Sequence, residues 1–376
     1  MDNKTPLKEI AKLFLKLGVI GFGGPAAHIA MMQQEVVEKR KWLTQQHFLD
    51  LIGAANLIPG PNSTEMAIHI GHEKAGWKGL ITAGICFIFP AVIITGSFAW
   101  LYKEYGQIPE VKPFIYGIKP AIIAVILSAV FPLAKKSIKT IQLGIIAAAV
   151  LLLSLLNCNE IFLMFGAGAL AVLLYYFKLD KNNNLHSFIP LALFQISDHR
   201  FFSAVNWNLF LIFLKIGAIL YGSGYVLFAF LDAELVAAGL LSRTQLIDAI
   251  AVGQFTPGPV FSAVTFIGCQ INGFSGALFS TIAIFLPSFV FVALLNPLVK
   301  KMRYSQLFST FLDAVNAASI AIIISICLEM GSETIAGWRT VLIALLSIAL
   351  LLKYKKINSA FIVLAGSITG YLLTFV

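Results

Sequence analysis

The sequence predicts an all-α integral membrane protein made of two inverted homologous repeats, each with a broken first helix, a re-entrant Pro-Gly-Pro hairpin and about four long transmembrane helices. Three observations support this class: an apolar composition, two Pro-Gly-Pro breaks, and basic loops that change position between the halves. Of the 376 residues, 59% are hydrophobic and only 12% are charged, whereas soluble domains carry about 25% charged residues. We therefore expect a multi-pass integral membrane protein.

The composition also excludes several classes of function. The net charge of +9 is expected to report membrane orientation, because Lys and Arg concentrate in cytoplasmic loops, so no nucleic-acid partner is expected. The four cysteines stand in separate segments without metal-ligand spacing, and no nucleotide-binding fingerprint is visible. No metal site, cofactor or enzyme activity is therefore expected. The polar start, without a small-residue cleavage site, argues against a removable signal peptide.

In the first half, residues 10–34 are predicted to form one crossing, broken at the glycine-rich stretch 21–25. Two short stretches, 46–58 and 62–73, then flank Pro59-Gly60-Pro61. Proline ends a helix because it has no backbone donor, and lipid cannot satisfy the freed backbone groups. This pair is therefore predicted to be a re-entrant hairpin. Four long spans are expected over residues 79–102, 113–133, 141–156 and 161–177.

The second half repeats the landmarks of the first in register. Residues 213–217 (FLKIG) correspond to residues 14–18 (FLKLG), and a second triplet corresponds to the first. Further along, Gly71, Gly76, Gly79 and Pro90 correspond to Gly268, Gly273, Gly276 and Pro287. So many landmarks in register indicate a duplication. We assign residues 1–178 to a first repeat, 179–206 to a linker and 207–376 to a second repeat.

Loop charge predicts that the two repeats are inserted in opposite orientations. The loop after the second long span is basic in the first half (residues 135–139) but carries Glu329 and Glu333 in the second, where residues 300–303 and 353–356 are basic instead. Basic loops stay in the cytoplasm, so equivalent loops would lie on opposite faces. With about five crossings in each half, both termini are expected outside and the linker inside, although N-terminal lysines argue against an outside N-terminus.

An anion site is predicted where the two triplets end. Both triplets are expected near the membrane midplane, and the residues that follow them start helices. A helix N-terminus presents free N–H groups and a positive dipole end, which stabilise an anion by up to about 2 kcal/mol. Two such ends with nearby hydroxyl groups suit a small tetrahedral oxyanion. The candidate substrate-binding residues around these ends are Pro59, Gly60, Pro61, Asn62, Ser63, Thr64, Thr256, Pro257, Gly258, Pro259, Ser262, Gly23, Gly24 and Pro25.

Three acidic residues are candidates for coupling. Glu65 follows Asn62 at the spacing of a capping box, or it couples transport to protons as an ionisable group at membrane depth. Asp50 and Asp248 occupy equivalent places in the segments that lead to the triplets. For this pair, a structural hydrogen bond and a part in transport are both open.

The basic candidates also carry two interpretations each. Lys16 and Lys215 either snorkel to the interface or form a symmetric basic pair that attracts an anion. His28, just after the glycine-rich break, either packs or lines the site. His69 and His72 are expected to be helix-end residues.

These landmarks resemble the chromate ion transporter (CHR) family. Its first half is matched by residues 22–28 (FGGPAAH), Glu35, residues 42–43 (WL), the first triplet and residues 89–90 (FP). Its second half is matched by residues 253–259 (GQFTPGP), 265–268 (TFIG) and 285–289 (FLPSF). The resemblance covers essentially the whole chain. Departures from the family pattern are Asn56 in place of a glutamine, residues 221–224 (YGSG) and residues 239–241 (GLL).

The resemblance implies a two-domain secondary transporter that expels chromate from the cytoplasm, across a bacterial cytoplasmic membrane, by using the membrane potential or the proton gradient. It also implies sulfate as a competing or counter-transported dianion. We therefore predict an alternating-access chromate exporter, with a sulfate or organic-anion transporter and a passive anion channel as alternatives. The expected partners are the oxyanion and membrane lipid, and a homodimer is compatible with the sequence.

Overall fold

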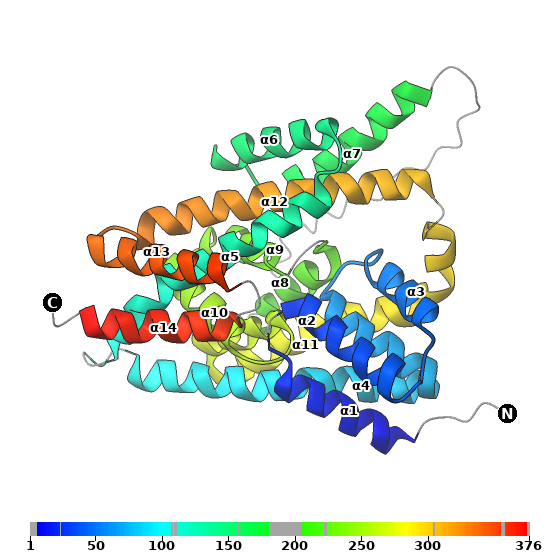
Figure 1. Cartoon of the computed structure of the whole chain (residues 1–376), viewed down its shortest axis with the longest axis horizontal. Helices are drawn as coiled ribbons and strands as arrows, with labels where there is room; N and C mark the ends of the chain where they lie inside the picture. The colour runs from blue at the N-terminus through cyan, green and yellow to red at the C-terminus, as the bar shows by residue number, and fades with distance from the viewer. Residues whose placement is uncertain are drawn as a thin grey trace.

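The computed structural model describes residues 6–22, 24–106, 108, 111–156, 158–179, 205–221, 224–303, 305–354 and 358–373, and within these ranges it contains helices and no strand. The predicted all-α class is therefore confirmed for the described chain (Figure 1). The helices are α1 (Leu7–Ile20), α2 (Gly24–Gln33), α3 (Gln45–Ala55), α4 (Asn62–Tyr105), α5 (Lys112–Ser137), α6 (Ile141–Leu155), α7 (Glu160–Leu179), α8 (Val205–Ile219), α9 (Val226–Leu231), α10 (Arg243–Phe255), α11 (Ala263–Arg303), α12 (Gln306–Thr334), α13 (Trp338–Lys353) and α14 (Ser359–Leu372). Three short turns of other helix types are η1 (Gln34–Lys39), η2 (Asp232–Val236) and η3 (Val260–Ser262).

Five segments of the described chain are long and apolar enough to cross a membrane. They lie in α4, α5, α7, α12 and the stretch formed by η3 and α11. Three shorter apolar helices, α6, α8 and α14, accompany them. The four long spans predicted for the first half fall within α4, α5, α6 and α7. The linker predicted between the repeats falls almost wholly on residues 180–204, which lie outside the described residues.

The first apolar segment folds back on itself, so the prediction of a single broken crossing is wrong. The Nζ atom of Lys16 in α1 lies 2.9 Å from the Oε1 atom of Glu35 in η1. In one straight helix these residues would be about 28 Å apart, because a helix rises 1.5 Å per residue. The chain therefore reverses between α1 and α2, and the contact of Lys215 with Glu234, 2.7 Å, shows the same reversal in the second repeat. A glycine-rich break permits either a kink or a reversal, and these distant contacts decide between them.

The Pro-Gly-Pro triplets lie at the tips of two further helical hairpins. On either side of the first triplet, α3 and the start of α4 lie antiparallel, because the Nε2 atom of His47 is 3.4 Å from the Oε2 atom of Glu73. A second reversal follows inside α4 at Gly76, whose φ is 59°. The second repeat turns in the same way at Gly273, whose φ is 60°. The placement of these hairpins in a membrane stays a prediction.

The repeated glycines mark a close helix crossing in each repeat. A Cβ atom on Gly71 would overlap the carbonyl oxygen of Gly79, and a Cβ atom on Gly268 would overlap that of Gly276. These glycines therefore let the two arms of each reversed helix touch through their backbones. The same contact at equivalent positions explains why these landmarks recur in the sequence.

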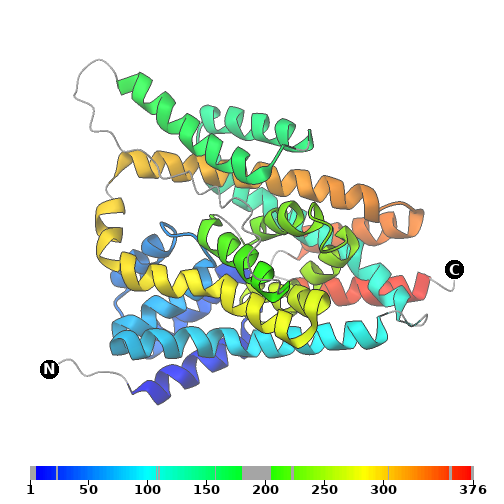
Figure 2. The ribbon, with the colours of Figure 1, turned by 180° about the vertical axis from the view of Figure 1, so that it is seen from behind.

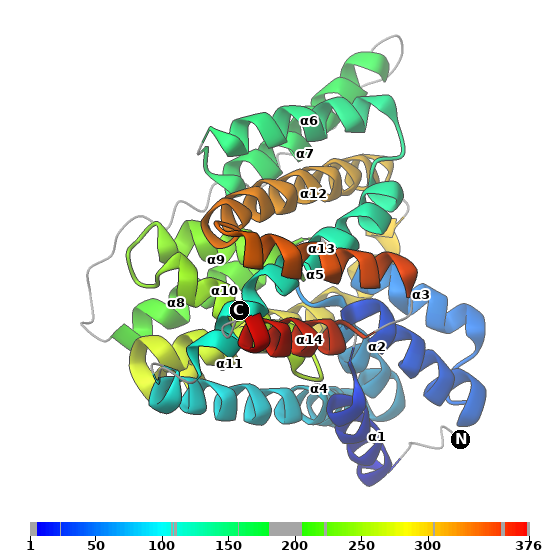
Figure 3. The ribbon, with the colours of Figure 1, turned by 60° about the vertical axis from the view of Figure 1, so that its left-hand side comes forward.

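The two repeats exchange their last helices. α6 and α7 of the first repeat pack against α12 of the second, and α13 and α14 of the second pack against α5 of the first (Figures 1 and 3). Figure 2 shows the long part of α11 beside α4, and these two helices also pack together. In Figure 1 the part of α4 after its reversal runs toward the end where α14 ends. The part of α11 after its reversal runs in the opposite direction. The insertion of the repeats in opposite orientations stays a prediction.

The number of crossings and the membrane face of each terminus stay predictions, because both are defined relative to a membrane. α1 begins and α7 ends at the same end of the long axis (Figures 1 and 2). α14 ends at the opposite end of that axis.

Candidate functional site

The two triplets meet the opposite repeat through a matched pair of backbone hydrogen bonds. The N–H of Gly60 donates to the carbonyl oxygen of Leu220 at 2.8 Å, and the N–H of Gly258 donates to that of Gly21 at 2.7 Å. Leu220 and Gly21 directly follow α8 and α1, which are equivalent helices. Both triplets are buried throughout. The structure therefore places the two predicted breaks at the interface between the repeats.

Both central glycines have a backbone that favours glycine and no room for a side chain. Gly60 has a φ of 133°, and a Cβ atom there would overlap Oε1 of Glu65 and lie 2.6 Å from Oγ of Ser288. Gly258 has a φ of 91°, and its Cβ atom would lie 2.8 Å from that of Ala91. Positive φ values are disfavoured for residues with a Cβ atom. These positions therefore need glycine for both conformation and space.

The start of α4 beside the first triplet holds a buried carboxyl group. Glu65 is fully buried, and its Oε1 atom accepts a hydrogen bond of 3.4 Å from Oγ of Ser288 in the second repeat. The capping-box interpretation is wrong, because the cap residue is Pro61 and no side chain caps the helix. The amide of Glu65 bonds the Pro61 carbonyl oxygen, and Asn62 donates its side-chain amide to Oδ1 of Asn56 at 2.6 Å.

The second triplet adjoins a cluster of three buried hydroxyl groups instead. Thr95 Oγ1 lies 3.4 Å from Oγ1 of Thr256 and 3.3 Å from Oγ of Ser262. At the first triplet, the positions equivalent to Thr95 and Thr256 are occupied by Val292 and Ile58. The hydroxyl cluster therefore exists on one side only. Sequence reasoning missed Thr95, because a single threonine in a long apolar span carries no local signal.

The two helix starts are therefore chemically different. Glu65 corresponds to Ala263, and Ser288 corresponds to Ala91, so the carboxyl contact of the first triplet has an apolar counterpart at the second. Thr64 is buried and its Oγ1 atom has no hydrogen-bond partner among the described residues. A buried carboxyl group therefore lies beside the first helix start, whereas hydroxyl groups lie beside the second.

The two predicted basic residues are each paired within their own repeat. Lys16 contacts the buried Glu35, which Lys39 and Arg40 also contact. The hydrogen bond from Lys16 is the largest cause that lowers the pKa of Glu35 to about 2, burial opposes this shift, and Lys39 and Arg40 add to it. Lys215 makes the equivalent pair with its own glutamate. The recurrence of a glutamate 19 positions after each lysine was the signal for these pairs.

His28 contacts the carbonyl group that the second triplet uses. Its Nε2 atom lies 2.8 Å from the carbonyl oxygen of Gly21, which also accepts the N–H of Gly258. A carbonyl can only accept, so Nε2 carries the hydrogen in this contact. The ring is buried and stands edge-on to Phe87. His28 therefore positions the tip of the first hairpin beside the second triplet.

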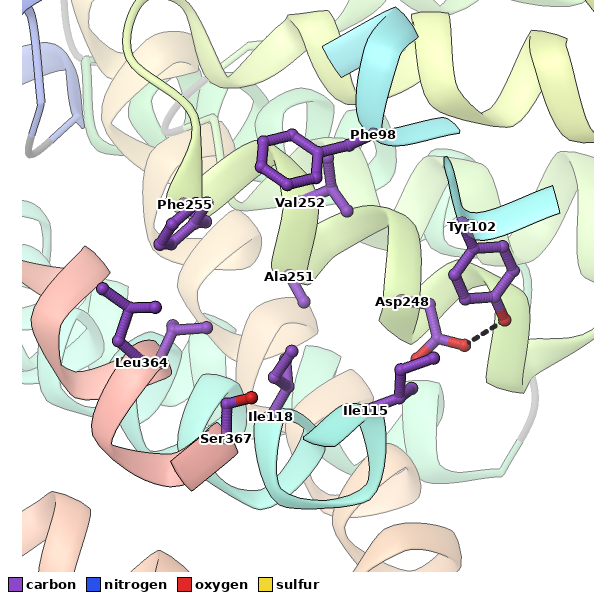
Figure 4. A pocket seen from close by; sticks show the side chains of 11 residues that line it. Phe98, Tyr102, Ile115, Ile118, Asp248, Ala251, Val252, Phe255, Leu364 and Ser367 are labelled. Carbon is purple, nitrogen blue, oxygen red and sulfur yellow. Dashed lines mark hydrogen bonds between the residues drawn. The ribbon is translucent and has the colours of Figure 1, made fainter. Parts of the chain in front are cut away.

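The two equivalent aspartates have different surroundings. Asp248 is buried, accepts a hydrogen bond of 2.6 Å from the hydroxyl of Tyr102 and lies 3.4 Å from Nζ of Lys119. Figure 4 shows Asp248 and Tyr102 together at one side of a cavity of about 190 Å³. Asp50 is half-buried and accepts from Gln46 at 3.4 Å. The cavity is lined mainly by apolar side chains and a carboxylate, which does not suit a dianion.

The remaining candidates lie around the first reversal. Gly24, with a φ of 79°, begins α2 and Pro25 follows it. Gly23 lies outside the described residues. Ser63 is buried at the start of α4. No group of three potential metal ligands occurs in the part of the chain that the structure describes.

Comparisons with known proteins agree with the duplicated architecture. The sequence model of the family described as "Chromate transporter" matches the chain twice, over residues 8–172 and 207–371. The chain belongs to the chromate transporter family. This membership supports chromate transport across a membrane by a multi-pass protein, and it places the chain in a family of transporters.

Three relatives illustrate the match. This chain is 30% identical to a chromate transport protein of Cupriavidus metallidurans, over 97% of this chain and 92% of that protein. It is also 30% identical to a probable chromate transport protein of Synechococcus elongatus, over 97% and 95% of the two chains. An uncharacterized transporter of Methanocaldococcus jannaschii is 26% identical over 99% and 95%. No solved structure matches the chain.

Proposed function

We propose that this chromate transporter is a secondary transporter that exports chromate by alternating access and binds it beside the second triplet. The observation that carries the site is the buried hydroxyl cluster of Thr95, Thr256 and Ser262 next to the start of η3 and α11. Hydroxyl groups and helix-start N–H groups donate to an oxyanion without adding a fixed charge. Each contact is modest, so the ion can also leave.

The asymmetry between the triplets favours the second one. A carboxylate beside a dianion is repulsive, and Glu65 is the buried carboxyl next to the first triplet. The second triplet has Ala263 and Ala91 at the corresponding places. The same donor set fits sulfate, which is also a tetrahedral dianion. Transport measurements with both ions therefore identify the substrate.

Removing the hydroxyl groups is the direct test of the site. Each hydrogen bond to a charged partner is worth about 1.5–3 kcal/mol, so Thr95→Val and Ser262→Ala are each expected to raise the KM for chromate by about tenfold or more. The measurement is uptake of labelled chromate into proteoliposomes. Ser154→Ala, which removes a buried hydroxyl in α6 that has no partner among the described residues, serves as the control.

Three results would contradict this proposal. If Thr64→Val raises the KM and the two variants at the second triplet do not, the anion binds at the first helix start. If wild-type protein moves labelled sulfate but no chromate, the proposed identity of the substrate is wrong. Current that passes at fixed potential without any coupled solute would indicate a channel instead of a transporter.

We also propose that the repeats are inserted in opposite orientations, as their loop charges indicate. Residues 135–139 and 300–303 are then both cytoplasmic. Single cysteines in place of Lys136 and Lys301, in a chain freed of its own four cysteines, are expected to react with an impermeant thiol reagent only from the cytoplasmic face. Labelling from opposite faces would refute this arrangement.

A further inference from the structure

The first part of α4 carries a row of ionisable side chains. Glu65, His69, His72 and Glu73 are separated by four, three and one positions. On a helix, residues three and four apart lie on the same face, so these side chains form one stripe. The stripe begins at the first triplet and ends at the reversal of α4.

The inner members of the stripe are buried without full hydrogen bonding. Glu65 is 0% exposed and His69 is 1% exposed. The Oε2 atom of Glu65 and the Nε2 atom of His69 have no hydrogen-bond partner among the described residues. Burying an unpaired polar group costs free energy, so its presence calls for a function. Ionisable chains of this kind within membranes serve as proton relays.

The outer members reach the surface. His72 is half-buried, interacts electrostatically with His69 and stands edge-on to the ring of Trp77. The side chain of Glu73 is 34% exposed and lies 3.4 Å from that of His47, which is 42% exposed. The stripe therefore runs from solvent at the pair of His47 and Glu73 to the repeat interface at Glu65.

The second repeat lacks this stripe. Ala263 stands in place of Glu65, and the buried Phe266 and Ile267 occupy the level of His69. Gln245 corresponds to His47. The same hairpin can therefore be built without these histidine and glutamate side chains, which argues that the ionisable groups of the first repeat are not needed for packing.

We propose that this stripe is a proton route to a proton-binding site at Glu65, and that a proton moves with the anion in the same direction. Water at the His47 and Glu73 end supplies the proton. Each imidazole accepts a proton at one nitrogen and releases one from the other. The Glu65 carboxylate becomes a carboxylic acid, and the solution loses one proton. The groups that face Glu65 from other elements are Ser288 and Tyr221.

The direction of coupling follows from electrostatics and rests on the proposed anion site. A carboxylate within about 10 Å of a dianion, at an effective dielectric constant of about 20, weakens binding on the order of a hundredfold. Protonated Glu65 removes this repulsion. Coupling is reciprocal, so the anion also favours the protonated form. Export of a dianion with one proton still moves negative charge outward, which the membrane potential drives.

The test separates net transport from exchange. Proteoliposomes that contain a pH-sensitive dye receive an inward gradient of chromate, and wild-type protein is expected to acidify the interior. In Glu65→Gln the acidification is expected to fall at least tenfold, while exchange of labelled for unlabelled chromate stays within twofold, because exchange needs no net proton movement. His69→Phe, which copies the second repeat, is expected to slow acidification about tenfold with exchange retained. Glu160→Gln, a partly buried carboxyl at the start of α7, is the control.

The outcomes are distinct. If wild-type protein exchanges chromate but never moves protons with it, or if Glu65→Gln acidifies like wild type, the proton route is overturned. Equal loss of exchange and acidification in both variants, in protein that remains folded by size-exclusion chromatography, also overturns it, because the residues would then serve substrate binding. If wild-type protein exchanges no chromate at all, the proposed function fails instead.

Discussion

Replacing Gly60 or Gly258 with alanine is expected to abolish chromate transport. Each glycine has a positive φ, which costs a residue with a Cβ atom about 1–2 kcal/mol. The added methyl group would also meet Ser288 or Ala91 across the repeat interface, and overpacking of this kind costs about 1–3 kcal/mol. At Gly258 the neighbour is the Cβ atom of Ala91, which cannot rotate away, so the triplet has to move and its hydrogen bond to the other repeat is strained. At Gly60 the side chains of Glu65 and Ser288 have to rotate, which breaks the contact between them.

Thermal unfolding in detergent and chromate uptake in proteoliposomes measure the two effects. Gly331→Ala in α12 is the matched control, because its Cβ atom would have no heavy atom within 4 Å, and alanine is favoured over glycine inside a helix. This control should retain uptake and stability. Wild-type uptake by Gly60→Ala and Gly258→Ala would show that the tight contact of the triplets is not required.

Arg243→Gln is expected to destabilise the second repeat strongly. Arg243 forms two hydrogen bonds of 3.0 Å with Asp232 and lies 3.2 Å from Glu329 and 3.0 Å from Glu333. It therefore ties η2 and α10 to α12. Removing one partner of a buried ion pair costs about 3–5 kcal/mol, and partial exposure of Arg243 reduces this cost. We expect a clear loss in the free energy of unfolding, measured by denaturation in detergent.

The first repeat supplies the control for this ion pair. At the positions of Asp232 and Arg243 it has Gln33 and Gln45, which share a neutral hydrogen bond of 3.2 Å. The double change of Asp232→Gln with Arg243→Gln copies that pair and is expected to recover most of the lost stability. If the double variant is as unstable as the single one, the contacts of Arg243 with α12 carry the stability instead.

The sequence predicted the class of fold and the repeats but not the path of the chain at the first break. The triplets and recurring glycines have local causes, since proline lacks a donor and a close helix crossing needs glycine. The reversal after α1 depends on Lys16 meeting Glu35, and no local rule distinguishes it from a kink. Only the same spacing in the second repeat pointed to it.

The two helix starts were predictable from the sequence, and the side chains around them were less so. Proline and glycine identified both helix starts, yet Thr95 comes from a distant span that packs there only in the folded chain. Glu65 satisfied the local spacing of a cap, but the carbonyl of Pro61 bonds its amide and its side chain turns to Ser288. Packing between the repeats therefore overrides the local rule.

The paired amide bonds between the repeats set an order on biosynthesis. Gly60 needs Leu220, and Gly21 needs Gly258, so the first repeat is complete in sequence well before its partners exist. At about 5–20 residues per second, the roughly 160 residues from Gly60 to Leu220 take on the order of ten to thirty seconds to make. Until then, the backbone groups at the tips of the first hairpins need hydrogen bonds from water or from another protein. The nascent first half therefore has unpaired backbone groups at these tips until the second half has been synthesised.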